Sequence, residues 1–360
     1  MKIVFVYPNL TRLERVTLGL AYVASRVQKK GHECHLVDYT WGGGYEKTTE
    51  VVRRTGAGVV GISVKSGEVD FCIGLSRKLK REFGCTIIWG GVHTSIDSDK
   101  TIALDCVDII CVGEGEEATM ELLDSLDKGE LDTTIPNLWF KKDGEIVRNP
   151  VRALTQNLDD LSFPDRNLHA TQRYIEQSGT VDIIAGRGCP YQCSYCVEPT
   201  YAELFKGSGT FVRYRSVENL LDEIADLKRR FKFRWINFVD DVFTIDIRWL
   251  RKFAPSYKKY FKIPYTCNAR IEAMREESYQ LLKDSGCHSL EMGIESGSES
   301  LRRKVLERKM TNQKIIEAFD LAHKYGLKTM SFNMVGIPYE TKQDIQETTE
   351  MAVQVDTKFI

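Results

Sequence analysis

The alternation of strands and helices along the chain is the feature that most restricts its fold. Between residue 1 and about residue 130, runs of apolar residues alternate with stretches that have helical spacing. The strand-like runs are 2–8, 33–39, 58–66, 86–91 and 107–116, and the clearest helical stretches are 17–32 and 69–84. Strands separated by helices pair in parallel, because each crossover needs a helix. This part therefore predicts an α/β fold, an open, doubly wound parallel sheet of the Rossmann-like type.

A second βα series begins at residue 181. Its strand candidates are 181–187, 235–241, 264–270, 289–296 and 327–338, and its clearest helix is 216–231 with Ser216 as N-cap. Five strands, each followed by a helix, predict part of a β/α barrel. Residues 356–360 read as the beginning of a sixth strand. We therefore expect a partial (β/α)6 barrel that is truncated at the sixth strand, and a chain that is a fragment.

Residues 131–180 do not show this alternation of strands and helices. They contain a hairpin-like Asp143-Gly144 turn and a turn-rich segment around Pro164. We expect three parts: a Rossmann-like domain at 1–130, a hairpin and linker at 131–180, and a partial barrel at 181–360.

The overall charge excludes partners that depend on a strong field. The chain has 360 residues with 50 basic and 51 acidic side chains, so that neither nucleic acid nor an anionic membrane is an expected partner. The N-terminus lacks the pattern of a signal peptide, and no apolar run approaches the roughly 20 residues that span a bilayer. The expected location is the cytoplasm, where the ten cysteines should be mostly reduced.

Three of those cysteines form a motif. In "GRGCPYQCSYC" (186–196), Cys189, Cys193 and Cys196 follow a predicted strand with the spacing C-x3-C-x2-C. Structural zinc sites use four ligands and usually a second Cys or His pair, which is absent at such spacing. In a [4Fe–4S] cluster each cysteine thiolate binds one iron, so three cysteines leave one iron open for a substrate. A zinc site completed by His169 is the alternative.

This loop resembles the cluster loop of the radical SAM superfamily. The resemblance implies that the open iron chelates S-adenosylmethionine, and that electron transfer from the cluster cleaves it to a 5′-deoxyadenosyl radical. Tyr195 matches a family position that contacts the adenine. Later segments resemble further parts of the site. "MVGIPYET" (334–341) resembles the segment that lies against adenine, and the residues implied to bind S-adenosylmethionine are Asp240, Asp241, Arg270, Glu295 and Ser296.

Any one of these segments could instead be a helix cap or a turn, but all of them in order along one barrel are hard to explain that way. Asp240 or Asp241 would take the methionine amino group, or would cap the next helix. Arg270 could grip a carboxylate with both nitrogens of its fork. Glu295 and Ser296 match the motif that contacts ribose and carboxylate.

The first domain resembles a cobalamin-binding domain. The matching residues are Ser63, Gly90 and Gly91, and the "VGEGE" segment with Glu114 and Gly115. The family's Asp-x-His-x-x-Gly motif is absent, so we expect bound cobalamin to lack a histidine ligand below cobalt. His93 is a less favoured substitute, and a domain that survives as a scaffold is the alternative.

The two resemblances together imply a radical SAM enzyme that uses a [4Fe–4S] cluster, S-adenosylmethionine and cobalamin. The implied reaction is methyl transfer to an unactivated carbon or phosphorus of a small molecule, or a related ring formation or rearrangement. Flavodoxin or ferredoxin is the expected electron donor. The alternatives are an enzyme like the tRNA methylthiotransferases, or a non-catalytic or truncated cobalamin-binding module.

Overall fold

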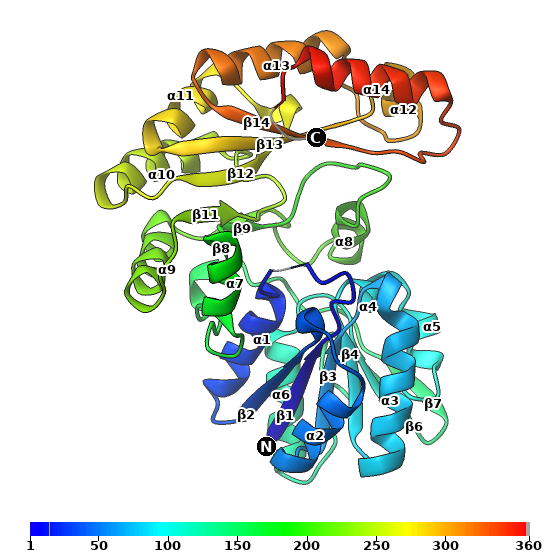
Figure 1. The fold of residues 1–360 in the computed structure, drawn as a ribbon. Coiled ribbons are helices and arrows are strands. Elements are labelled where there is room, and N and C mark those ends of the chain that lie inside the picture. Colours follow the sequence, from blue (N-terminus) through cyan, green and yellow to red (C-terminus); the bar gives the residue numbers. More distant parts are fainter. Residues whose placement is uncertain (14, 358–360) are drawn as a thin grey trace. The chain divides into compact units, whose positions relative to one another are not determined.

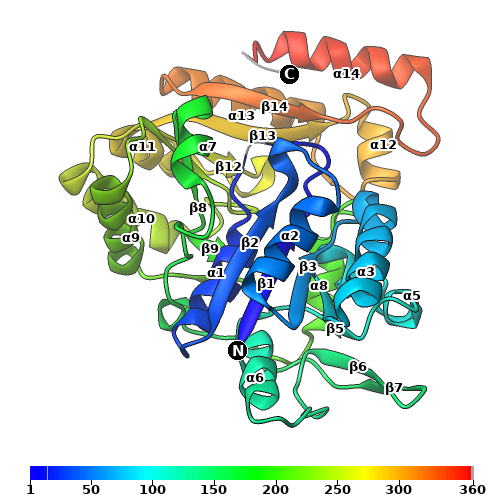
Figure 2. The same ribbon diagram turned by 60° about the horizontal axis from the view of Figure 1, so that its bottom comes forward.

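The computed structural model describes residues 1–13 and 15–357, and it forms two compact units (Figures 1 and 2). The front unit comprises Met1–Gln156, Asp160–Gln177 and Thr200–Thr210. The barrel unit comprises Asn157–Asp159, Ser178–Pro199 and the chain from Phe211 onward.

The front unit is built on a seven-stranded sheet with the order β2-β1-β3-β4-β5-β6-β7. The first five strands are parallel, and β6 and β7 are antiparallel to their neighbours. The strands are β1 (Lys2–Tyr7), β2 (Glu33–Asp38), β3 (Val59–Ser63), β4 (Thr86–Gly90), β5 (Ile109–Cys111), β6 (Leu138–Lys142) and β7 (Glu145–Arg148). The helices are α1 (Leu18–Gln28), α2 (Glu46–Thr55), α3 (Val69–Phe83), α4 (Val92–Ile96), α5 (Ser98–Ala103), α6 (Glu116–Asp127) and α7 (Thr171–Ser178), with short turns at η1 (Tyr39–Trp41) and η2 (Ser66–Glu68). The short turn η3 (Leu158–Asp160) falls where the chain passes between the two units.

Both faces of this sheet are covered by helices, as the apolar strands predict. On one face, Val4 and Val6 pack in a cluster with residues of α2 and α3. On the other face, Ile3 and Phe5 pack in a second cluster with residues of α1 and α6. Because successive side chains of a strand point to opposite faces, this single strand contributes to both cores of a three-layer unit.

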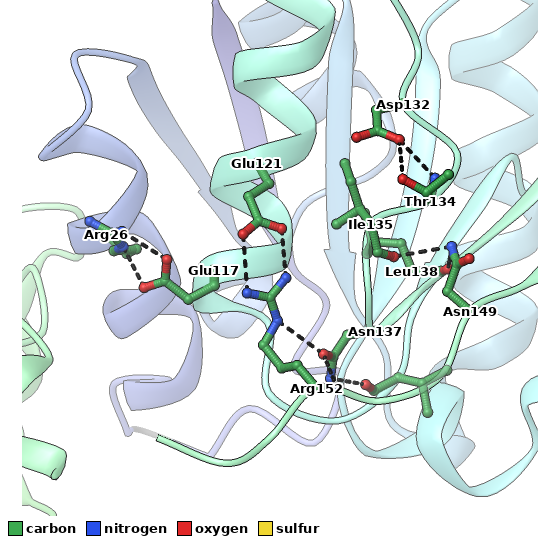
Figure 3. Close-up of polar contacts among 11 residues, drawn as sticks. Arg26, Glu117, Glu121, Asp132, Thr134, Ile135, Asn137, Leu138, Asn149 and Arg152 are labelled. Atoms are coloured by element: carbon green, nitrogen blue, oxygen red, sulfur yellow. Dashed lines mark hydrogen bonds and ion pairs between the residues drawn. The ribbon is translucent and has the colours of Figure 1, made fainter. Parts of the chain in front are cut away.

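The hairpin β6–β7 extends the same sheet. Its turn is Asp143-Gly144, and both residues have positive φ (51° and 83°), as in the tight turn that the sequence predicts. The predicted boundary at residue 130 precedes this hairpin. Beyond it, Arg152 binds Glu121 of α6 through both nitrogens of its fork (2.6 and 3.1 Å) and donates to Asn137 (Figure 3). These bonds tie the segment after β7 back to the front unit.

The barrel unit holds five parallel strands in sequential order, β8-β11-β12-β13-β14. They are β8 (Thr180–Ile183), β11 (Trp235–Phe238), β12 (Tyr265–Ala269), β13 (Cys287–Glu295) and β14 (Lys328–Asn333), and a separate antiparallel pair joins β9 (Gly186–Arg187) to β10 (Arg213–Tyr214). The helices are α9 (Val217–Arg230), α10 (Ile247–Tyr260), α11 (Glu276–Ser285), α12 (Glu299–Lys304), α13 (Asn312–Lys324) and α14 (Lys342–Gln354), with a short turn at η4 (Ile271–Ala273). A further helix, α8 (Glu198–Leu204), begins in the barrel unit, but most of its residues belong to the front unit. Ser216 caps α9 as predicted, since its hydroxyl accepts from the Asn219 N–H at 3.0 Å.

Two strands of the barrel unit end earlier than the sequence predicts, and one prediction is not tested. The run 181–187 is interrupted, because β8 ends at Ile183 and β9 pairs with β10 instead. The last strand ends at Asn333, and the chain then turns through Gly336 with a φ of 86°. The predicted sixth strand falls largely on residues 358–360, which lie outside the described residues. In the described part of the chain, no helix is both long enough and apolar enough to cross a membrane.

Candidate functional site

The loop that carries the three cysteines is held by close packing against β10. Gly188 has a φ of 88°, and a Cβ there would lie 2.6 Å from the Phe211 carbonyl oxygen. A Cβ at Gly186 would lie 2.8 Å from the Arg213 carbonyl oxygen. Only glycine fits at both positions without displacement of backbone. The glycines of the motif therefore shape the loop that presents the thiols.

All ten cysteines are free thiols, and Cys189 and Cys193 are buried whereas Cys196 is exposed. The Cys189 N–H donates to the carboxylate of Glu198 at 2.9 Å. Burial raises the pKa of the Cys189 thiol to about 11. Burial, together with the charge of Asp241, raises the pKa of Glu198 to about 7. The loop thus combines two buried sulfurs with an acidic side chain that binds its backbone.

Arg270 contacts this loop directly. One terminal nitrogen, Nη1, donates to the Cys193 Sγ at 2.9 Å, and the guanidinium lies 3.7 Å from the centroid of the Tyr191 ring. Its Nη2 donates to Glu272 at 2.9 Å. Its Nε is buried without a hydrogen-bond partner. Arg270, which follows β12, is therefore anchored against the sulfur, and one donor is still unused.

A chain of buried charges continues from Arg270. Glu272 also accepts from Arg308 at 3.0 Å, and Arg308 donates to Glu295 at 2.8 Å. Burial alone would raise the pKa of Glu272, but the two guanidinium groups hold it below its usual range. Burial raises the pKa of Glu295, and Arg308 opposes that rise. The hydroxyl of Ser194 donates to the Val305 carbonyl at 2.6 Å, which ties the cysteine loop to the segment that carries Arg308.

The two neighbouring aspartates after β11 differ in their surroundings. The buried carboxylate of Asp240 accepts from the N–H groups of Ala185 (3.1 Å) and Gly186 (2.5 Å). Burial raises the pKa of Asp240 to about 7. Asp241 is exposed. Asp240 therefore holds the backbone ahead of the cysteine loop, and Asp241 is the aspartate with an accessible side chain.

Glu295 is the last residue of β13, and Ser296 follows it. Glu295 has a φ of 67°, in the left-handed region, and the pairing with β14 shifts register there. Ser296 is fully buried, and its hydroxyl accepts from the Ser298 N–H at 3.2 Å. Tyr195 is partly exposed, and its hydroxyl lies 3.5 Å from a nitrogen of Arg308. The structure thus gathers Tyr195, Arg270 and Glu295 around one buried charge network, while Ser296 makes local structural contacts.

The donor set of this loop is three thiols, which suits an iron–sulfur cluster. Within residues 1–13 and 15–357, no group of three or more His, Cys, Asp or Glu side chains is arranged to hold a metal ion. The thiolates of a [4Fe–4S] cluster do not need to converge on one ion, because each thiolate binds a different iron. The three thiols share one loop, and the cation of Arg270 beside Cys193 suits a ligand that must be a thiolate.

The predicted cobalamin residues lie at the carboxyl edge of the front sheet. Ser63 and Gly90 are paired at the ends of β3 and β4, and Gly91 follows with a φ of 95°. Glu114 and Gly115 follow β5, and Glu114 lines a small, open hollow whose wall includes Asn137, Arg152 and Phe205. In parallel sheets, ligands bind outside the carboxyl ends of the strands, where the strand order reverses. Here the order reverses between β1 and β3.

Both histidines that the sequence offered as alternatives belong to the front unit. His93 lies in α4, its Nδ1 is 3.1 Å from the Ser66 hydroxyl, and burial lowers its pKa. His169 belongs to the front unit, where its Nδ1 is 4.0 Å from Asp38.

Two family models match the chain. The model of the radical SAM superfamily matches residues 183–352, and that of the B12 binding domain matches residues 12–123. The chain carries a radical SAM domain and a B12-binding domain. The predicted cofactors, a [4Fe–4S] cluster, S-adenosylmethionine and cobalamin, are confirmed by these two domains at the level of the family. Neither alternative reading, methylthiotransferase-like or non-catalytic, is supported by these domains.

Relatives that are similar to this chain include an uncharacterized methyltransferase of Pyrococcus horikoshii, which is 27% identical over 100% of this chain and 79% of its own length. An anaerobic magnesium-protoporphyrin IX monomethyl ester cyclase of Cereibacter sphaeroides is 23% identical over 98% of this chain and 60% of its own length. The solved structure of the methyltransferase TsrM from Kitasatospora setae, with cobalamin and a [4Fe-4S] cluster bound, has a TM-score of 0.80. It is 18% identical and covers 99% of this chain and 71% of its own, so this likeness shows a shared fold.

Four residues of this site were not predicted from the sequence. They are Tyr191, Glu198, Glu272 and Arg308. Glu272 lies in the "NARIE" segment, two residues after Arg270. Its position just after a predicted strand, where site residues of a β/α barrel lie, could have indicated it. Arg308 gives no such signal, because it follows α12 in an irregular segment and reaches the site through packing against the cysteine loop.

Proposed function

We propose that this radical SAM enzyme transfers a methyl group to an unactivated carbon or phosphorus of a small molecule, with cobalamin in the front unit. The observation that carries this proposal is the three-cysteine loop with Arg270 against Cys193, in a chain that also has a B12-binding domain. When bound, the cluster, S-adenosylmethionine and cobalamin supply a carbon radical and a methyl carrier. The relatives that are named methyltransferases support methyl transfer, and the one named a cyclase makes ring formation the second candidate.

Different residues of the barrel unit are proposed to bind the cluster and S-adenosylmethionine. Cys189, Cys193 and Cys196 are the proposed cluster ligands. The exposed carboxylate of Asp241 is the group best placed for the ammonium of S-adenosylmethionine, since Asp240 is engaged by backbone N–H groups. Tyr195 would pack along the adenine, because its ring is partly exposed beside the loop.

The charge network fixes the remaining contacts. Glu295 is held by Arg308, so that its carboxylate keeps one position for a ribose hydroxyl. The unused Nε of Arg270 could donate to the carboxylate of S-adenosylmethionine. Ser296 would contribute through its backbone, since its hydroxyl is occupied locally.

The front unit would dock cobalamin at the carboxyl edge of its sheet. Ser63, Gly90 and Gly91 form the part of this edge where backbone can approach a ligand closely, and Glu114 and Gly115 form the neighbouring part. We also propose that the enzyme works in the cytoplasm and that flavodoxin or ferredoxin donates the electron.

The test is anaerobic reconstitution with iron, sulfide and cobalamin, followed by an iron assay, an absorption spectrum and chromatography for 5′-deoxyadenosine. Wild-type protein should hold four irons per chain and form 5′-deoxyadenosine. Replacing all three cysteines of the loop with Ala should abolish both, while cobalamin binding persists. Four irons retained in that triple variant, or zinc in the protein after anaerobic purification, would refute the proposal.

A further inference from the structure

Arg270 makes contacts that binding of S-adenosylmethionine alone would not require. Its guanidinium donates to the Cys193 sulfur at 2.9 Å, lies over the Tyr191 ring and donates to Glu272 at 2.9 Å. The side chain is only 11% exposed. Contacts on three sides therefore fix this cation against one of the three sulfurs that would hold the cluster.

The chemical effect of such a contact follows from charge. When a cluster takes up one electron, its negative charge increases, and part of that charge resides on the sulfur ligands. A hydrogen bond and a positive charge at a ligand sulfur stabilise the reduced form more than the oxidised form. Hydrogen bonds to the sulfurs and solvent exposure are among the features that set cluster potentials.

We propose that Arg270 is a positioning residue that raises the reduction potential of the cluster through its hydrogen bond to Cys193. This inference rests on the proposed function, because it needs a cluster on Cys189, Cys193 and Cys196. It gives Arg270 a role in electron transfer to the cluster that is separate from binding S-adenosylmethionine.

The ion network explains how the contact persists. Glu272 accepts from Arg270 and from Arg308, and Arg308 in turn donates to Glu295. Two guanidinium groups and two carboxylates compensate one another in a buried site, and such an arrangement resists rearrangement because each partner loses a hydrogen bond if it moves. The network thus connects a proposed cluster ligand with the residue proposed to contact S-adenosylmethionine.

The test is a redox titration of the reconstituted full chain, without S-adenosylmethionine, in which the reduced cluster is followed by electron paramagnetic resonance. Arg270→Met keeps the length of the side chain and removes its charge and donors. We expect it to lower the one-electron equilibrium constant for reduction at least tenfold, which is a shift of about 59 mV. Arg270→Lys, which keeps the charge but loses the planar fork, should give a smaller shift in the same direction.

Arg251→Met is the matched control. Arg251 is an exposed arginine of the same unit that pairs with Glu277. Its replacement removes the same charge but costs little stability, because exposed ion pairs contribute little. It should leave the potential unchanged. Iron content and the dissociation constant of S-adenosylmethionine are measured for every variant.

An unchanged potential in Arg270→Met protein with four irons would overturn the inference. If its affinity for S-adenosylmethionine also fell, Arg270 would be a ligand clamp instead. If the Met variant holds no cluster, Arg270→Gln takes its place with the same threshold, and failure of both to hold iron would indicate a purely structural role. A wild-type chain that takes up no cluster would instead contradict the proposed function.

Discussion

Gly293 leaves the space that the carboxylate of Glu295 occupies. A Cβ at Gly293 would lie 2.0 Å from the Glu295 Oε1 and 2.7 Å from Nη1 of Arg308. No real Cβ approaches an atom that closely, so the glycine is required by the ion pair two residues further along β13. The pair is buried, and it has no room to move aside without breaking a charged hydrogen bond.

Gly293→Ala should therefore act on Glu295. We expect the added methyl to displace the carboxylate, to destabilise the fold by about 1–3 kcal/mol as overpacking does, and to weaken binding of S-adenosylmethionine. Urea unfolding and equilibrium dialysis measure the two effects. Gly58→Ala is the control, since a Cβ there meets nothing within 4 Å. Unchanged affinity in the Gly293 variant would remove Glu295 from the binding site.

Asp240 and Asp241 offer a matched pair. Asp240→Asn places an amide group where two backbone N–H groups need an acceptor, so we expect a loss of about 1–3 kcal/mol in the free energy of unfolding. Asp241→Asn should keep the stability and weaken binding of S-adenosylmethionine by roughly one to two decades. The reverse pattern, with the stability loss at Asp241, would exchange their roles.

Substitutions at Gly90 and Gly91 should have different effects, one on cobalamin binding and the other on stability. Gly91 has φ 95° and ψ −172°, and a Cβ there would lie 2.9 Å from the Val64 nitrogen. Gly91→Ala should therefore cost about 1–3 kcal/mol of stability whether or not cobalamin binds. A Cβ at Gly90 would meet only the Cys111 Cβ, at 3.7 Å. Gly90→Ala should fold normally, and weaker cobalamin binding by that variant would place the ligand against the backbone. Full affinity would argue against a contact at Gly90.

Asp38 predicts a pH dependence in the front unit. Burial alone would raise its pKa, but the nearby His169 ring and hydrogen bonds from Tyr174 and Thr40 outweigh burial and hold the pKa at about 2. A carboxyl group with a lowered folded pKa stabilises the fold above its ordinary pKa, and this contribution is lost as the pH falls through the folded value. We expect about 2 kcal/mol to disappear between pH 4 and pH 2.

Tyr174→Phe removes the hydroxyl that donates to Asp38, so the pH dependence of unfolding should become shallower. Tyr260→Phe, at an exposed tyrosine, is the control. Urea unfolding followed by circular dichroism at a series of pH values measures both. An equal slope in the two variants would mean that Asp38 is not held by Tyr174.

Local patterns predicted most of the fold. Apolar runs separated by helical spacing located the parallel strands, and the Asp143-Gly144 turn located the hairpin, because both signals lie within a few residues. The sequence could not assign that hairpin to the front sheet, since its pairing with β5 joins residues almost thirty positions apart. The same limit applies to the site. Cysteine spacing is local, whereas the bond from Arg308 to Glu272 joins segments that only packing brings together.

The hairpin β6–β7 determines whether the front unit, produced as a separate protein, would associate through an exposed strand. A parallel sheet that ended at β5 would leave a row of unpaired N–H and C=O groups, which is a template for pairing with another chain. Here β6 pairs with β5, and the short β7, with the charged residues Glu145 and Arg148 at its ends, forms the new edge of the sheet. A version of the front unit cut at residue 130 would expose β5 and would be prone to associate edge to edge, whereas one that retains β7 and the Arg152 anchor keeps the edge closed.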